Sequence, residues 1–121
     1  MLVADDHPSI RENLRYLIDA EPDLVCVGAA KDGRQCLALC GELLPDVLVL
    51  DNDMPGINGL TTAKILETLL PRIRVILYTL DDQVCSVAQR RGAVACITKD
   101  APYETLLRAI RLGSASESHI A

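Results

Sequence analysis

Short apolar runs alternate with amphipathic segments along the chain, and this alternation restricts the possible fold more than any other feature of the sequence. A short apolar run bounded by turn residues is typical of a strand that is buried on both faces. Segments with apolar residues at helical spacing, such as Ile10, Leu14 and Ile18, are typical of helices with one buried face. Repeated β-α units of this kind require a parallel sheet with helices on both faces and right-handed crossovers. The expected strands span residues 2–4, 24–30, 47–50, 73–78 and 94–98.

Length and composition fit a single α/β domain. The chain has 121 residues, is 50% hydrophobic and lacks Trp and Phe, so its core must be largely aliphatic. We assign residues 1–112 to the domain and residues 113–121 to a polar tail or the start of a linker. The net charge of −5 argues against binding of nucleic acid by this segment alone. No apolar run approaches the roughly 20 residues of a membrane span, and an acid follows Ala4 directly, so neither a membrane segment nor a signal peptide is expected.

The cysteines form an odd-numbered set without a Cys-x-x-Cys motif. Cys36 and Cys40 lie four residues apart, on one face of an expected helix, where we expect them to be small buried hydrophobic residues. A metal site would need His or further Cys residues nearby. The set as a whole points to a reducing, cytoplasmic setting, in which disulfides are rare. Its members are Cys26, Cys36, Cys40, Cys85 and Cys96.

Polar residues stand where four of the expected strands end. Asp5 and Asp6 follow the first strand, Asp51 follows the third, Thr79 follows the fourth, and Lys99 follows the fifth. The C-terminal ends of parallel strands lie on one edge of the sheet, where open α/β folds bind their ligands. Each residue also has an ordinary structural alternative, because an Asp can cap a helix or turn, a Thr can be a turn residue and a Lys can be solvated.

This set of residues suits phosphoryl transfer onto Asp51. Three carboxylates in one pocket repel one another, and oxygen ligands without a Cys partner favour a hard ion such as Mg²⁺. We expect the neighbouring His7 to be a packing or capping residue and not a metal ligand. The carboxylate of Asp51 would attack in line, while the metal and Lys99 neutralise the phosphoryl oxygens and the hydroxyl of Thr79 contacts them.

The same residues resemble the receiver domain of bacterial two-component response regulators, over about residues 2–112. The match rests on the strand-end residues together with Met54-Pro55-Gly56 and Asn58-Gly59. Two further stretches, Ala4 to Pro8 and Thr98 to Pro102, resemble regulators of the NarL/FixJ class. Members of that class usually carry a LuxR-type helix-turn-helix output domain after the receiver.

The resemblance implies specific roles for the site residues. Asp51 would accept a phosphoryl group from a sensor histidine kinase or from small phosphodonors. Asp6 and Asp51 would bind Mg²⁺ through their carboxylates, Asp53 through its backbone carbonyl and Asp5 through water. Thr79 and Lys99 would contact the phosphoryl oxygens, and movement of Thr79 would shift an equilibrium between inactive and active states.

The resemblance also implies a flavodoxin-like (βα)5 fold, a doubly wound sheet with strand order 2-1-3-4-5. It implies a cytoplasmic switch that is not an enzyme beyond self-phosphorylation and slow autodephosphorylation. A homodimer is possible, through helices 1 and 5 or through the face of helices 4 and 5. DNA would be bound only by an output domain outside these residues.

Three residues bear on how such a switch would work. Leu80 stands where receivers usually have a small residue, and we hypothesise that it shields the aspartyl phosphate. Cys96 stands where they usually have Tyr or Phe, which leaves the usual coupling of Thr79 to an aromatic side chain in question. The side chain of Asp53 lies beside the expected pocket, where it can order or repel the hydrolytic water.

Two alternatives differ in kind from a phosphorylated switch. The sequence Asp51-Asn52-Asp53 is an Asp-x-Asp motif like that of haloacid-dehalogenase-like phosphatases, in which Asp53 would be the general acid/base. That family, however, places its acidic pair after the nucleophile, and this chain lacks room for a cap. The second alternative is a degenerate receiver that acts as a phosphorylation-independent interaction module, a reading that Leu80 and Cys96 keep open.

Overall fold

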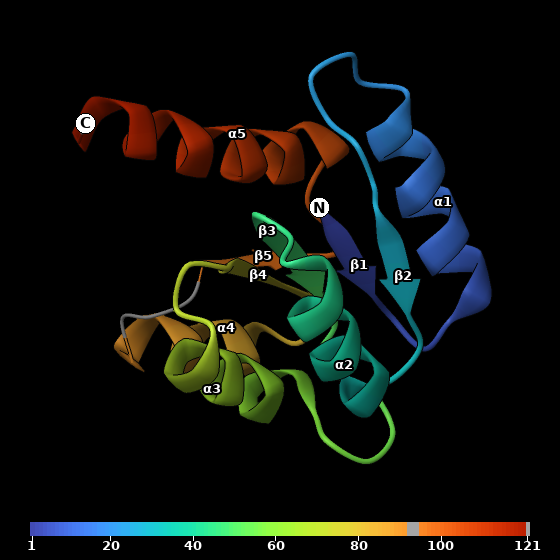
Figure 1. Cartoon of the computed structure of the whole chain (residues 1–121). Helices are drawn as coiled ribbons and strands as arrows, with labels where there is room; N and C mark the ends of the chain where they lie inside the picture. Colours follow the sequence, from blue (N-terminus) through green and yellow to red (C-terminus); the bar gives the residue numbers. More distant parts are fainter. Residues whose placement is uncertain (92–94, 121) are drawn as a thin grey trace.

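A five-stranded parallel sheet forms the centre of the molecule in the computed structural model, which describes residues 1–91 and 95–120 (Figure 1). The strand order is β2-β1-β3-β4-β5, so the predicted doubly wound sheet and its 2-1-3-4-5 order are confirmed. All four neighbouring pairs are parallel. The strands are β1 (Leu2–Ala4), β2 (Gly28–Ala30), β3 (Val47–Leu50), β4 (Arg74–Thr79) and β5 (Ala95–Thr98).

Helices cover both faces of the sheet. Helices α1 and α5 lie on one face, and α2, α3 and α4 lie on the other (Figure 1). In the described part of the chain, no helix has both the length and the hydropathy that a membrane-spanning segment requires. The helices are α1 (Pro8–Asp19), α2 (Gly33–Leu43), α3 (Gly59–Leu69), α4 (Asp82–Arg91) and α5 (Tyr103–Ile120).

The central strand β3 contributes to two separate cores because its side chains alternate between the two faces. Leu48 and Leu50 belong to the core under α2, α3 and α4. Val49 belongs to the core on the other face, with Ile18 of α1 and Leu106 of α5. All five side chains are almost completely buried, and each contributes about 1.5–3 kcal/mol to folding by leaving water. A polar residue that directly follows β3 is therefore held on a rigid support.

Strand β2 is shorter than the sequence predicts. The prediction covered residues 24–30, but only Gly28–Ala30 pair with β1. The amide of Cys26 donates to the side chain of Asp19 at 2.9 Å instead of to a neighbouring strand. Val25 and Val27 are exposed, so the apolar run indicated a strand over residues that the sheet does not include.

The helix ends also differ from the prediction. Helix α5 continues through residues 113–120, which the sequence indicated as a polar tail. Most of these residues have moderate or good helix propensity, and the single Gly113 costs about 1 kcal/mol relative to Ala. Leu69, the last residue of α3, is 68% exposed, and Leu70 packs against the core instead. Val94, the expected start of the fifth strand, lies outside the described residues.

The cysteines fall into two groups. Cys26, Cys36 and Cys40 are free and buried, as expected for small hydrophobic residues. Cys85 of α4 and Cys96 of β5 form a disulfide. The expectation of a fully reduced set is wrong for this pair, because residues 11 apart in the chain come together where α4 packs on β5. Sequence spacing alone gives no sign of that contact.

Candidate functional site

Backbone hydrogen bonds hold the predicted site residues at one edge of the sheet. Asp5, Asp51 and Lys99 each directly follow a strand. The backbone amide of each donates a hydrogen bond to the neighbouring strand and so extends the pairing of the two strands by one residue. Asp5 N–H donates to Ala30 O at 3.0 Å, and Asp51 N–H donates to Ala4 O at 2.9 Å. Lys99 N–H donates to Thr79 O at 2.8 Å. The positions of these residues therefore follow from the register of the sheet and not from a flexible loop.

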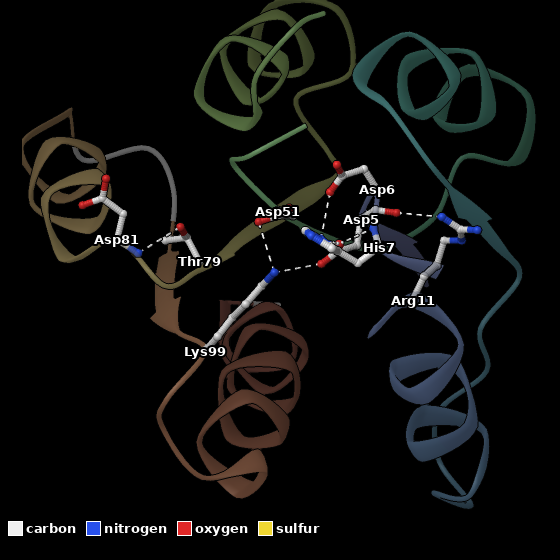
Figure 2. Close-up of polar contacts among 8 residues, drawn as sticks. All are labelled: Asp5, Asp6, His7, Arg11, Asp51, Thr79, Asp81 and Lys99. Carbon is white, nitrogen blue, oxygen red and sulfur yellow. Dashed lines mark hydrogen bonds and ion pairs between the residues drawn. The ribbon is translucent and has the colours of Figure 1, made fainter. Parts of the chain in front are cut away.

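A single lysine bridges two buried carboxylates at this edge (Figure 2). Lys99 Nζ lies 2.9 Å from Asp5 Oδ2 and 3.2 Å from Asp51 Oδ1. The lysine side chain is 10% exposed and the two aspartates 1% and 2%. Burial alone would lower the pKa of Lys99, but the hydrogen bond to Asp5 and the charges of both aspartates outweigh it and raise the pKa. The ammonium group is therefore charged and shared between the two acids.

The negative charge of the Asp51 carboxylate is only partly balanced by Lys99. Burial and the neighbouring charge of Asp5 raise its pKa, and the charge and hydrogen bond of Lys99 oppose this rise incompletely. Its Oδ2 atom is buried and has no hydrogen-bond partner among the described residues. A buried acceptor without a partner is costly, so this oxygen is available to a ligand that brings positive charge or a donor.

Four residues could hold a cation at this point. One ligand atom from each of Asp5, Asp6, His7 and Asp51 lies within 4.8 Å of the others. Three of the four groups are carboxylates, the donors that Mg²⁺ prefers, and Asp51, whose Oδ2 has no hydrogen-bond partner among the described residues, is one of them. The donor set therefore fits the predicted magnesium ion. The side chain of Asp53 is exposed and is not part of this group, so its predicted backbone contact with the metal stays a prediction.

His7, which directly precedes α1, and Arg11 of α1 contact the acidic cluster (Figure 2). His7 Nδ1 lies 3.1 Å from Asp5 Oδ1 and 3.0 Å from Asp6 Oδ1, and its backbone N–H donates to Asp5 Oδ1 at 2.9 Å. Arg11 Nη1 donates to the backbone carbonyl of Asp5 at 2.9 Å. The sequence analysis placed His7 beside the site but missed Arg11. An arginine in the first turns of a helix carries no signal that it will turn back onto the preceding strand.

The loop after β3 fixes Asp51 through its neighbour Asn52. The side-chain oxygen of Asn52 accepts a hydrogen bond from Leu60 N–H at 3.0 Å, and the backbone carbonyl of Asn52 accepts one from Gly59 N–H at 3.1 Å. The start of α3 is thereby docked on the residue next to Asp51. A Cβ atom on Gly59 would lie 2.6 Å from Asp51 O and 2.7 Å from Asn52 Cα. This close approach explains why a glycine stands at position 59, at this helix start.

Thr79 is fully buried, and its hydroxyl is engaged with the segment that leads into α4. Its Oγ1 accepts from Asp81 N–H at 3.2 Å. Figure 2 shows Thr79 apart from the cluster of Asp5, Asp51 and Lys99, on the side where α4 begins. The next residue, Leu80, is 72% exposed. Among the predicted site residues, Asp5, Asp6, Asp51 and Lys99 thus come together, and Thr79 lies next to them without a contact to the carboxylates.

The chain is similar to known proteins over nearly its whole length. A family model described as the response regulator receiver domain matches residues 1–111. The chain is 38% identical over 119 residues to the nitrate/nitrite response regulator protein NarL of Escherichia coli K12, covering 97% of this chain and 55% of that protein. It is 36% identical over 118 residues to the transcriptional regulatory protein YxjL of Bacillus subtilis, covering 96% of this chain and 54% of that protein. The chain thus spans about half the length of these curated relatives.

Solved structures give the same result for the fold. The response regulator domain of Thermotoga maritima CheB superposes with a TM-score of 0.84 at 34% identity, covering 93% of this chain and 92% of that one. The receiver domain of a NarL-type regulator from Mycobacterium tuberculosis superposes with a TM-score of 0.82 at 31% identity, covering 90% of each chain. These similarities cover 90% or more of this chain.

Proposed function

The chain belongs to the response regulator receiver domain family of two-component systems, and from this premise we propose that it is a switch controlled by phosphorylation of Asp51. The observation that carries the proposal is the state of that carboxylate. Asp51 is 2% exposed, one oxygen contacts Lys99 at 3.2 Å, and the other oxygen has no hydrogen-bond partner among the described residues. A buried acid with one free oxygen beside a fixed cation suits a nucleophile toward phosphorus.

In the proposed reaction, the carboxylate of Asp51 attacks the phosphorus of a phosphohistidine on a sensor histidine kinase. The P–O bond to Asp51 forms as the P–N bond breaks, and the kinase histidine leaves. Lys99 supplies positive charge to the phosphoryl oxygens from its position beside Asp51. Mg²⁺, held by Asp5, Asp6 and Asp51 with the backbone of Asp53, would neutralise charge on the same oxygens. Beyond self-phosphorylation and slow autodephosphorylation, we propose no enzymatic turnover.

The response to phosphorylation is proposed to begin at Thr79. Its hydroxyl accepts a hydrogen bond from Asp81 N–H, and a phosphoryl group on Asp51 offers it negatively charged acceptors nearby. Turning the hydroxyl toward those oxygens breaks its contact with the segment before α4. A local charge change of this kind shifts the population of two conformations, here those of α4 and its surroundings.

The wider role is proposed from the relatives. Both curated relatives are named as regulators, and each is about twice as long as this chain. We propose a cytoplasmic regulator in which a helix-turn-helix output domain outside these residues binds DNA. Formation of a homodimer on phosphorylation would complete this scheme.

A degenerate receiver that acts as an interaction module remains the second candidate. The resemblance implies an aromatic residue at the position of Cys96. Cys96 instead forms a disulfide with Cys85. This bond restricts conformational change and so favours the interaction module. A phosphatase of the haloacid-dehalogenase type has no such support, because the side chain of Asp53 is exposed and lies outside the acidic cluster.

The test is the intact mass of the chain after incubation with acetyl phosphate and Mg²⁺. We expect a gain of about 80 Da, the mass of one phosphoryl group. Asp51→Asn should show no gain, and EDTA added before the donor should prevent it. The gain should be retained in Asp53→Asn, which preserves the backbone carbonyl. No gain in the native chain, under conditions that label another receiver domain, would favour the interaction module.

A further inference from the structure

The disulfide between Cys85 and Cys96 joins the two elements that flank the site. Cys85 lies in the first half of α4 and is buried, and Cys96 lies in β5 opposite Leu77 of β4. The Cα atoms of the two cysteines are 5.2 Å apart. Cys96 packs against the core that includes Leu77 and Val84, directly beneath α4. The bond therefore fastens the underside of α4 to the edge strand of the sheet.

Both ends of this link lead directly to site residues. Asp81, four residues before Cys85, donates its N–H to Thr79 Oγ1 and accepts from Val84 N–H at 3.2 Å, so the start of α4 is tied to the Thr79 hydroxyl. On the other side, Lys99 lies three residues after Cys96 and directly follows the last residue of β5, Thr98. A covalent bond between α4 and β5 thus restricts the movement that release of Thr79 from Asp81 would allow.

We propose that Cys85 and Cys96 form a redox-controlled lock on α4. In the disulfide form α4 is held on β5 whatever the state of Asp51, and in the dithiol form α4 is free to move. The functional meaning of the lock rests on the proposed switch, since it governs the step that follows phosphorylation. The lock itself, a redox-dependent freedom of α4, does not depend on phosphorylation.

The chemistry of the lock is thiol–disulfide exchange with a low-molecular-weight disulfide such as oxidised glutathione. One cysteine thiolate attacks a sulfur of that disulfide, forming a mixed disulfide and releasing one thiol. The second cysteine thiolate then attacks the protein sulfur and releases the second thiol. Two protein thiols lose two electrons and two protons, and one small disulfide becomes two small thiols. An excess of the small thiol reverses both steps.

The remaining cysteines do not compete for this role. Cys36 and Cys40 are buried neighbours on one helix, and Cys26 lies at the far edge of the sheet, near β2. All three are free. The pair in α4 and β5 is therefore the one place, among the described residues, where a cysteine bond crosses between two elements.

The test is amide hydrogen exchange, followed by mass spectrometry, on chains equilibrated in oxidised or reduced glutathione. Alkylation of the same samples reports whether Cys85 and Cys96 are bonded. Without any phosphodonor, we expect reduction to speed exchange in residues 82–88 by about tenfold or more, while β1 and β3 stay unchanged. Cys85→Ser should exchange like the reduced chain in both buffers, and the matched control Cys40→Ser should keep the redox response.

Addition of acetyl phosphate and Mg²⁺ separates the lock from the proposed function. If both hold, both forms gain phosphoryl mass, but only the reduced form changes its exchange in α4. A redox response in α4 without phosphoryl gain would support the lock and count against the switch. The lock is overturned if the two cysteines are alkylated in the oxidising buffer, if α4 exchanges equally in both forms, or if exchange changes equally throughout the sheet.

Discussion

Replacement of Lys99 by Met tests how the site is held together. In the native chain this ammonium group is the partner of both Asp5 and Asp51, at 2.9 and 3.2 Å. Methionine keeps most of the side-chain volume but removes the charge. Without metal, the variant therefore leaves two buried carboxylates close together with no cation between them.

The expected cost follows from the geometry. With an effective dielectric constant of about 20, contacts at 2.9 and 3.2 Å are worth about 6 and 5 kcal/mol. Desolvation of the three charged groups offsets much of this attraction, and partial protonation of Asp51 relieves part of the repulsion. Removing one partner of a buried pair typically costs about 3–5 kcal/mol. We expect a loss in that range, against a total of roughly 6–18 kcal/mol for a chain of this length.

Urea unfolding in EDTA measures this loss. With a slope of about 2 kcal/mol/M, the midpoint for Lys99→Met should fall by roughly 2 M. Adding Asp51→Asn to the variant should restore part of the stability, with a coupling of about 1 kcal/mol or more. Lys64→Met, at an exposed position on α3, is the matched control and should stay within about 0.5 kcal/mol of the native chain. Equal midpoints for Lys99→Met and Lys64→Met would refute the account of a shared buried cation.

Four further predictions follow from single features of the structure. Because the pKa of Asp51 is raised above its unfolded value of 3.8, stability of the metal-free chain should fall as the pH rises through the folded pKa, and Asp51→Asn should remove this slope in urea titrations. Gly59→Ala places a Cβ atom 2.6 Å from Asp51 O; we expect a loss of about 1–3 kcal/mol in urea and slower labelling by acetyl phosphate. Leu44→Gly should raise stability by about 0.5–1 kcal/mol in the same assay, since Leu44 is 62% exposed and has a φ of 47°. Leu80→Ala should speed loss of the phosphoryl group, measured as intact mass against time, and an unchanged rate would disprove the shielding hypothesis.

The part of the site that could be predicted from the sequence is the part that the strands determine. Asp5 and Asp51 directly follow the buried strands β1 and β3, and Lys99 directly follows the partly buried strand β5. Parallel pairing puts such positions on one edge of the sheet. Their convergence therefore needs only the strand assignments and the topology. The two-core arrangement is predictable for the same reason, because β3 has apolar residues on both faces.

Contacts made by side chains across elements could not be predicted in this way. The disulfide depends on how α4 sits on β5, and the return of Arg11 to Asp5 O depends on the angle of α1. Apolar composition also overstated the sheet, since Val25 and Val27 are exposed residues outside β2. The hydrophobic pattern predicts which face of a helix or strand is buried. The residue at which a helix or strand ends depends on which backbone hydrogen-bond partners are within reach.

The electrostatic state of the site suggests why phosphorylation would require a divalent cation. A phosphoryl group adds about 1.5 to 2 negative charges at a carboxylate whose cationic partner, Lys99, is already shared with Asp5. Lys99 cannot neutralise both acids and the new dianion, and burial removes much of the screening that water would supply. The rigid strand ends also prevent the acids from moving apart. A metal bound by Asp5, Asp6 and Asp51 would supply the missing positive charge. The excess of carboxylates therefore destabilises the metal-free fold, but it also allows the metal-bound site to accept a phosphoryl group.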